Sequence, residues 1–293
     1  MDILSYVLGY NKGKAQGAGS GGGGSENIDG DIGRYWRAEP KIPATLASAV
    51  QRTFEFNGHF HVVFQNSDTS AKEVWWLDEE GWHYLCTSPV INNGNATYIE
   101  WNGELHAWAD YEAQTKHYKY DPDTGEFVEI STFPGTGTTS NVGFVVNNEL
   151  YATVESGTQN TCDLYKFDGT AWSLAYEKAI KCQPSYNLCV IGDNLYYINL
   201  GKIYKFSLKN GTETLVSEGF DKNYGRLYKI GEKLYYLWKN EFYYRVEETG
   251  LVEFSTDFVA IANKTCVVND RVYFVAMGSS STYWCRAYSW KPE

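Results

Sequence analysis

The sequence predicts an all-β protein, a six-bladed β-propeller closed by an N-terminal strand. Three observations support this prediction. A strand pattern recurs six times between residues 31 and 293, aromatic residues make up 16% of the chain with 24 Tyr and 10 Trp against 2 Met, and a strand-like segment near the N-terminus matches one absent from the last repeat. Broad, stiff rings pack well on a pleated surface, so this composition favours strands over helices.

Each repeat carries a polar doublet between two apolar strands. Asn-Gly and related pairs tolerate the positive φ that a two-residue hairpin turn requires, so each copy is predicted to form a β-hairpin. The second residues of successive doublets are 38 to 45 residues apart. The doublets are Asn57-Gly58, Asn102-Gly103, Asn147-Asn148, Gly192-Asp193, Gly231-Glu232 and Asn269-Asp270.

An aromatic-x-apolar motif follows each doublet, and a turn and an outer strand come after it. Four strands in a repeat of this length are typical of a propeller blade. The clearest copies of the motif are Trp75-Trp76-Leu77, Tyr118-Lys119-Tyr120, Tyr165-Lys166-Phe167 and Tyr204-Lys205-Phe206.

The last repeat reaches Glu293 with only three strands, and its fourth is expected from the other end of the chain. The segment Tyr35-Trp36-Arg37-Ala38, which is followed by prolines, is similar to the outer strand Trp82-His83-Tyr84-Leu85. Pairing this segment with the strand that contains Tyr288 and Trp290 would close the ring and cover exposed strand edges.

The doublets, together with Tyr165-Lys166-Phe167-Asp168 followed by Trp172, resemble kelch repeats, and the resemblance spans nearly all of residues 31–293. It implies a propeller and makes a protein-interaction scaffold one of the alternative functions. Kelch blades typically carry a Gly-Gly doublet, and no copy here does. A sialidase-like or another six-bladed family is therefore an alternative.

Charge and hydropathy exclude two classes of partner. The net charge is −11 and the pI is about 5.0, so the chain repels phosphate backbones and no nucleic acid partner is expected. No run of 18 apolar residues occurs, so no membrane insertion is expected. The short apolar stretch from Ile3 to Leu8 follows Asp2 rather than a basic region, so it is not expected to be a signal peptide.

The cysteines are predicted to be reduced core or strand residues made in a cytosol, because none has a CxxC spacing and a chain of this size needs no disulfides. Secretion with disulfides is the alternative. The six are Cys86, Cys162, Cys182, Cys189, Cys266 and Cys285.

The first 30 residues are predicted to be separate from the propeller of residues 31–293. Residues 13–30 form a Gly/Ser-rich flexible linker, and residues 1–12 form a helical or extended anchor peptide. A helix this short is marginal alone and needs a partner surface. A disordered tail or a remnant of engineering is the alternative. The predicted docking residues are Ile3, Leu4, Tyr6, Val7, Leu8 and Tyr10.

The string ILSYVLGYNKG followed by a glycine-rich tract resembles the start of minor structural, tail-associated proteins from phages and prophages of Gram-positive bacteria. The resemblance implies a virion protein, assembled in the bacterial cytoplasm, that contacts other virion structural proteins through residues 1–12. Several copies in one assembly would raise the avidity of the propeller for a host-surface glycan or protein.

No catalytic, cofactor or metal site is predicted. GxGxxG, Walker, GxSxG and HExxH motifs do not occur. His59 and His61 share one face of a strand, but His61 and His106 occupy a repeat position that tyrosine holds elsewhere. Packing is therefore favoured over metal ligation.

A glycan-active hydrolase or lyase is the alternative function, because carboxylates from two blades could converge on the propeller axis. The acids Asp78-Glu79-Glu80 and Glu247-Glu248 fall at predicted turns, and the arginines stand at unrelated repeat positions without the cluster that a sialidase needs. Most aromatic residues are assigned to the core. The candidate ligand-facing aromatics are Trp101, Trp108 and Trp238.

Overall fold

The protein is all-β over the residues that the computed structural model describes. Among them, a short 3-10 turn, η1 (Ala44–Leu46), accompanies the strands, and no helix is long and apolar enough to cross a membrane. The described residues are 30–32, 36–46, 49–90, 96–109, 115–135, 141–156, 161–181, 188–218, 226–238, 242–247, 250–255, 265–276 and 286–290.

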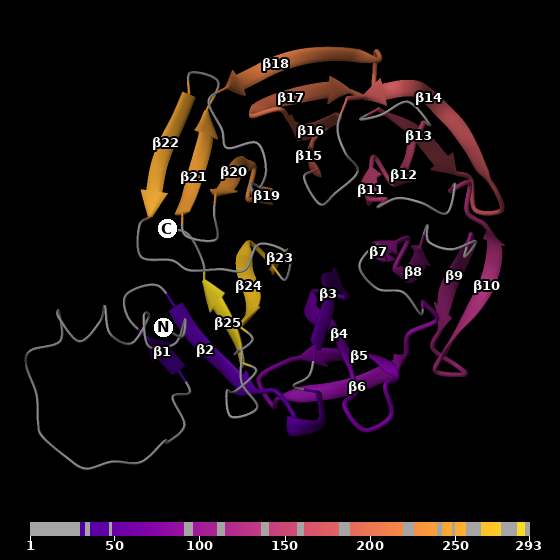
Figure 1. Cartoon of the computed structure of the whole chain (residues 1–293), viewed down its shortest axis with the longest axis vertical. Helices are drawn as coiled ribbons and strands as arrows, with labels where there is room; N and C mark the ends of the chain where they lie inside the picture. The colour runs from indigo at the N-terminus through magenta and orange to yellow at the C-terminus, as the bar shows by residue number, and fades with distance from the viewer. Residues whose placement is uncertain are drawn as a thin grey trace, which may run out of the picture.

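The described strands form six antiparallel sheets set around a common axis (Figure 1). In five sheets the strand order follows the chain from the axis outward. The first is β3 (Ala49–Phe56), β4 (His59–Gln65), β5 (Lys72–Leu77) and β6 (Trp82–Thr87); the second is β7 (Ala96–Trp101), β8 (Glu104–Ala109), β9 (Lys116–Asp121) and β10 (Glu126–Thr132). The third is β11 (Gly143–Val146), β12 (Glu149–Glu155), β13 (Cys162–Phe167) and β14 (Trp172–Ile180).

The remaining sheets continue the ring. The fourth is β15 (Leu188–Ile191), β16 (Asn194–Asn199), β17 (Lys202–Ser207) and β18 (Thr212–Glu218); the fifth is β19 (Arg226–Ile230), β20 (Lys233–Trp238), β21 (Phe242–Glu247) and β22 (Gly250–Ser255). The sixth is β23 (Thr265–Val268), β24 (Arg271–Ala276), β25 (Arg286–Trp290), β2 (Trp36–Lys41) and β1 (Gly30–Ile32). Each innermost strand contacts the next one, and β23 contacts β3, so the arrangement is that of a propeller.

The predicted hairpin turns are confirmed. Each doublet joins the first and second strand of a sheet, with the flanking residues in register. Gly192 and Gly231 have positive φ while the residue after each does not, which is the φ pattern of a type II′ turn. Both members have positive φ, the pattern of a type I′ turn, in Asn57-Gly58, Asn102-Gly103, Asn147-Asn148 and Asn269-Asp270.

The predicted pairing of the two ends of the chain is also confirmed. Strand β2 runs antiparallel to β25, with Trp36 opposite Trp290 and Ala38 opposite Tyr288. Glu39 of β2 is buried and accepts a hydrogen bond from Ser289 of β25. Strand β1 then pairs with the outer edge of β2 as a fifth strand, which the sequence did not predict because three residues show no periodicity.

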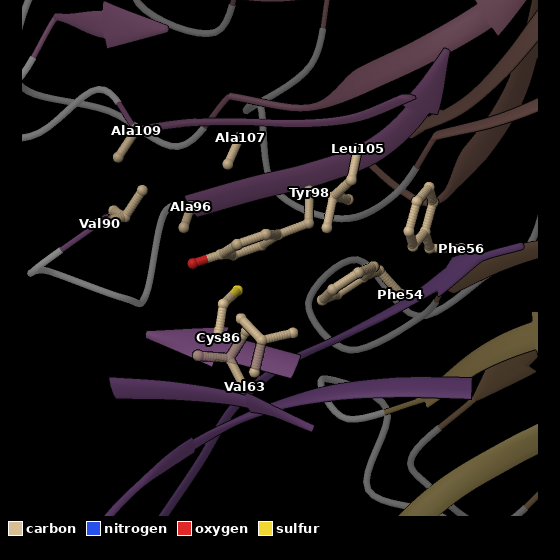
Figure 2. Close-up of a cluster of buried hydrophobic side chains, with 11 residues drawn as sticks. Phe54, Phe56, Val63, Cys86, Val90, Ala96, Tyr98, Leu105, Ala107 and Ala109 are labelled. Atoms are coloured by element: carbon tan, nitrogen blue, oxygen red, sulfur yellow. The ribbon is translucent and has the colours of Figure 1, made fainter. Parts of the chain in front are cut away.

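The core consists of separate clusters between neighbouring sheets. Figure 2 shows the cluster between the β3–β6 and β7–β10 sheets, where the rings of Phe54 and Tyr98 stack with centroids 4.9 Å apart. Small side chains such as Ala96 and Ala107 leave room for these rings. Cys86 lies in the same cluster, and burial raises the pKa of its thiol to about 12.

The described cysteines fit the prediction of core or strand residues. Cys86 and Cys189 are buried free thiols, Cys266 is a half-buried free thiol, and Cys162 is buried on β13. The two other cysteines, at positions 182 and 285, lie outside the described residues.

Candidate functional site

A cavity of about 750 Å³ lies where the innermost strands meet, and all six sheets contribute to its wall. Each innermost strand pairs with a neighbour on one side only, so its other edge turns toward the axis. The wall also carries several charged side chains, which is unusual for a packed interior. These charged residues are Arg52, Glu55, Glu100, Arg226 and Lys229.

Two arginines stand at one level of this cavity. Arg52 of β3 and Arg226 of β19 each lie five residues before the first residue of their doublet. Because equivalent repeat positions lie at equivalent depths along the axis, the two arginine backbones lie at one level, and both residues line the cavity. The expectation that the arginines occupy unrelated repeat positions is wrong for this pair. The equal spacing of the two arginines from their doublets is the sequence signal that indicates their shared level.

Buried hydroxyl groups lie near the two arginines. Arg52 Nε donates a hydrogen bond to the carbonyl oxygen of Ala96 at 2.5 Å, which holds its side chain between β3 and β7. Burial raises the pKa of the Tyr228 hydroxyl to about 12, although the nearby Arg226 charge opposes the shift. Burial likewise raises the pKa of Tyr98, whose hydroxyl lies 2.5 Å from Ser88 Oγ. Both tyrosines therefore keep their protons at neutral pH.

The other level of the cavity is acidic. Glu55 and Glu100 each lie two residues before a doublet, three residues further along the strand than the arginines. Partial burial raises the pKa of the Glu55 carboxyl, and the charges of Glu100 and Asp270 raise it further. Lys229 holds the same repeat position on β19 and forms an ion pair with Glu232 at 2.7 Å. At about 3.3 Å per residue, the two levels are about 10 Å apart.

Hydrogen bonds join neighbouring hairpin turns at the acidic end of the cavity. Asparagine side chains and one backbone amide link neighbouring doublets. The backbone amide of Asn57 also donates to Glu100 Oε2 at 2.7 Å. The links between doublets are Asn148 Nδ2 to Asn102 Oδ1 at 2.7 Å, Asn147 Nδ2 to Asp193 Oδ1 at 2.8 Å, Asn269 Nδ2 to the Gly58 carbonyl at 3.1 Å and the Gly231 amide to Asp270 Oδ1 at 2.6 Å.

The three candidate ligand-facing tryptophans have different environments. Trp101 is half-buried on the cavity wall, and its Nε1 donates to the Asn148 carbonyl at 2.8 Å. Trp108 is 0% exposed, so its assignment as ligand-facing is wrong; it stacks on Phe133 inside a core cluster. The side chain of Trp238 lies outside what the structure describes.

The histidines are packed as the repeat position predicts. His61 and His106 are buried on the second strands of their sheets, His61 against Phe54 and His106 against His117. Within the described residues, no three His, Cys, Asp or Glu side chains gather as a metal site.

Of the acidic residues predicted at turns, Asp78 directly follows β5 and Glu247 is the last residue of β21. Asp78 caps its turn, because its Oδ1 accepts the backbone amides of Glu80 and Gly81. Glu247 ends β21, and Glu248 lies outside the described residues. The same is true of all the docking residues predicted within residues 1–12.

No family model and no curated protein matches the sequence. Solved structures do match its fold. The structure of YjhT matches with a TM-score of 0.59 at 12% identity, over 86% of this chain and 95% of that one. An auxiliary nutrient binding protein from Bacteroides thetaiotaomicron matches with a TM-score of 0.53 at 11% identity, over 82% and 68%. A chain of a nidogen/laminin complex matches with a TM-score of 0.50 at 10% identity, over 73% and 89%. At these identities the likeness concerns the fold alone.

Proposed function

We propose that this chain is a non-enzymatic virion protein of a phage. Residues 1–12 dock on another virion structural protein, and the propeller binds a glycan or protein on the host surface. The virion half of this proposal rests on the sequence of residues 1–12 and the glycine-rich tract after them. The binding half rests on the charged axial cavity.

We further infer a six-bladed, kelch-like ring in which each sheet is one blade. The contacts between successive innermost strands, the pairing of β2 with β25 and the hairpin doublets support this inference. Asparagine side chains at the doublets link neighbouring blades, which gives them a role that the Gly-Gly doublet of kelch blades cannot perform.

The observation that carries the proposal is the position of strand β1, which follows the predicted anchor and linker in the sequence. Strand β1 lies on the outer edge of β2, at the rim of the ring (Figure 1). Gly30, the first described residue, therefore lies at the rim and not at the axis. An assembly could hold residues 1–12 while the axial cavity stays open to a ligand.

Deleting residues 1–12 tests the docking half. The shortened chain should remain folded but should no longer join its assembly, as measured by its copy number in purified particles. Leu4→Asp and Leu8→Asp should be nearly as damaging, because burying one such side chain contributes about 1.5–3 kcal/mol. Ser5→Asp adds the same charge outside the predicted docking residues and serves as the control. Unchanged incorporation after the deletion would rule out docking by this segment.

Two truncations test the ring. Removing residues 1–25 should leave the melting temperature nearly unchanged. Removing residues 1–40 also removes β1 and most of β2 and exposes the edge of β25, so the melting temperature should fall by many degrees. Equal melting temperatures for the two truncations would contradict closure by β2 and the six-bladed ring with it.

A glycan-active enzyme is the second candidate function, and Glu55 and Glu100 favour it. The pKa of Glu55 is raised in the direction that suits a general acid, and Glu100 is the nearby second carboxylate. Glu55→Gln should abolish release of reducing ends from host surface polysaccharide, while Glu126→Gln on the outer strand β10 should not. Absence of hydrolysis or lyase products with the unmodified chain would exclude this candidate.

A further inference from the structure

We propose that Arg52 and Arg226 form an oxyanion site at the arginine level of the axial cavity, which binds the carboxylate or phosphate group of a small ligand. This inference rests on the proposed binding function and names the ligand chemistry of that site. The arginine level lies toward the face opposite the hairpin turns.

Because the chain is negatively charged overall, two arginines in one cavity indicate a local site for an anion. The chain carries 36 acidic and 25 basic residues, so at long range it repels anions. An anion can bind only where cations are concentrated locally. Two of the seven arginines share one level of one cavity. A guanidinium group presents a planar set of donors that matches carboxylate and phosphate geometry, which a lysine ammonium does not.

The surroundings of Arg52 favour recognition over a loose surface charge. Its Nε is held by the Ala96 carbonyl, which orients the plane of the guanidinium group. The wall adds Thr97 at the same repeat position and Tyr98 and Tyr228 nearby, where the charge of Arg52 acts on the Tyr98 hydroxyl and that of Arg226 on the Tyr228 hydroxyl. A partly enclosed site of this kind strengthens charge-assisted hydrogen bonds relative to water.

The acidic level sets the orientation of the ligand. Glu55 and Glu100 repel an anionic group and accept hydrogen bonds from hydroxyl or ammonium groups. A ligand with its anionic group on the arginines would therefore place donor groups toward the hairpin end, across about 10 Å of strand. An acidic saccharide or a phosphorylated one of about two rings has this chemistry and length.

Titration calorimetry with the full chain tests the site, using D-glucuronate, inorganic phosphate and D-glucose as probes. Glucuronate, phosphate or both should bind, and glucose should bind much more weakly. Arg52→Gln and Arg226→Gln should each weaken anion binding about tenfold or more, because each removes charged hydrogen bonds. Arg226→Lys should weaken binding less than Arg226→Gln, since it keeps the charge without the planar donors.

Lys116→Gln is the matched control, because it removes one positive charge from an exposed ion pair with Glu129 on the outer part of a sheet. Its affinity for the anions should equal that of the unmodified chain. Arg52 also bridges β3 and β7, so Arg52→Lys, which keeps a donor for Ala96, replaces Arg52→Gln if the latter lowers the melting temperature.

Each outcome decides the proposal. Binding of glucuronate alone assigns a carboxylate ligand, and binding of phosphate alone assigns a phosphorylated one. If neither anion binds, or if Lys116→Gln weakens binding as much as the arginine variants, the oxyanion site is wrong. Incorporation into particles should be unaffected by all of these variants. An intact virion role without anion binding would therefore overturn the oxyanion site while leaving the docking proposal standing.

Discussion

The two cores on either side of the β7–β10 sheet are built from the same repeat but bury different chemistry. The first core, between the β3–β6 and β7–β10 sheets, is filled mainly by aliphatic side chains and alanines, together with Phe56 and the stacked pair Phe54 and Tyr98. The second core, between the β7–β10 and β11–β14 sheets, is aromatic and encloses His106 and His117. The repeat therefore determines where a core forms but not which side chains fill it.

The second core orders its histidines through a directed chain of hydrogen bonds. Trp172 Nε1 can only donate, and it lies 3.2 Å from His117 Nδ1, so that nitrogen is unprotonated. His117 Nε2 then carries the proton and donates to His106 Nδ1 at 3.0 Å. This leaves the proton of His106 on Nε2, 3.8 Å from Glu104 Oε2. Both rings are consequently held neutral.

The second core also contains unsatisfied polar atoms. Among the described residues, three buried side-chain nitrogens lack a hydrogen-bond partner: His106 Nε2, Trp108 Nε1 and Asn141 Nδ2. All three lie around the junction of the β7–β10 and β11–β14 sheets, because Asn141 contacts Thr97 of β7 at 2.9 Å. Each such group costs about 1–3 kcal/mol, so the second core depends on close aromatic packing for its stability.

The largest effect is expected from Trp108→Ala. Removing a fully buried indole should lower the free energy of unfolding by about 3–5 kcal/mol. Trp108→Phe should cost much less, because the ring contact with Phe133 is kept and the unsatisfied indole nitrogen is removed. Urea unfolding of both variants measures the difference. Equal losses for the two would mean that ring packing does not stabilise the second core.

The next largest effect is expected from acidification, which should destabilise the second core through its buried histidines. Burial lowers the pKa of His106 to about 4, and burial together with His106 lowers that of His117 to about 3. The unfolded chain takes up protons near pH 6.5, while the folded histidines stay neutral, so stability is lost as the pH falls from about 6.5 toward 4. At pH 5 each buried histidine should cost about 2 kcal/mol.

His106→Tyr tests this expectation, because tyrosine holds the same repeat position in the third to sixth sheets. Urea unfolding at pH 7 and pH 5 should show a smaller acid loss in this variant than in the unmodified chain. His61→Tyr makes the same change at the edge of the first core, where burial lowers the pKa of His61 to about 4. An acid loss unaffected by both variants would contradict the assignment to buried histidines.

Gly143→Ala should have the smallest of the three effects. A Cβ at this position of β11 would lie 2.6 Å from Trp108 Cζ2 and 2.8 Å from Thr97 Cγ2, so the second core must shift at a cost of about 1–3 kcal/mol. Trp108→Phe lacks the ring atoms in conflict, and the double variant should recover some of the loss. Strict additivity in this double-mutant cycle would show that the contact is not the cause.

The sequence by itself determined the local features of this protein. The doublets specified hairpin turns because positive φ is a property of Asn, Asp and Gly themselves, as Asn57-Gly58 and Gly192 illustrate. The similarity of Tyr35-Trp36-Arg37-Ala38 to an outer strand also located the strand that pairs with β25. Both signals are carried by a few adjacent residues.

Only the tertiary structure decided which side chains meet between sheets. Trp101 and Trp108 belong to the same hairpin and pack against the same cluster, yet one lines the cavity and the other is fully buried, because Trp101 lies on the innermost strand β7 and Trp108 on the second strand β8. Arg52 reaches Ala96 across 44 residues of chain, and it shares its level with Arg226. Such contacts depend on how blades pack around the axis, and no local pattern encodes that packing.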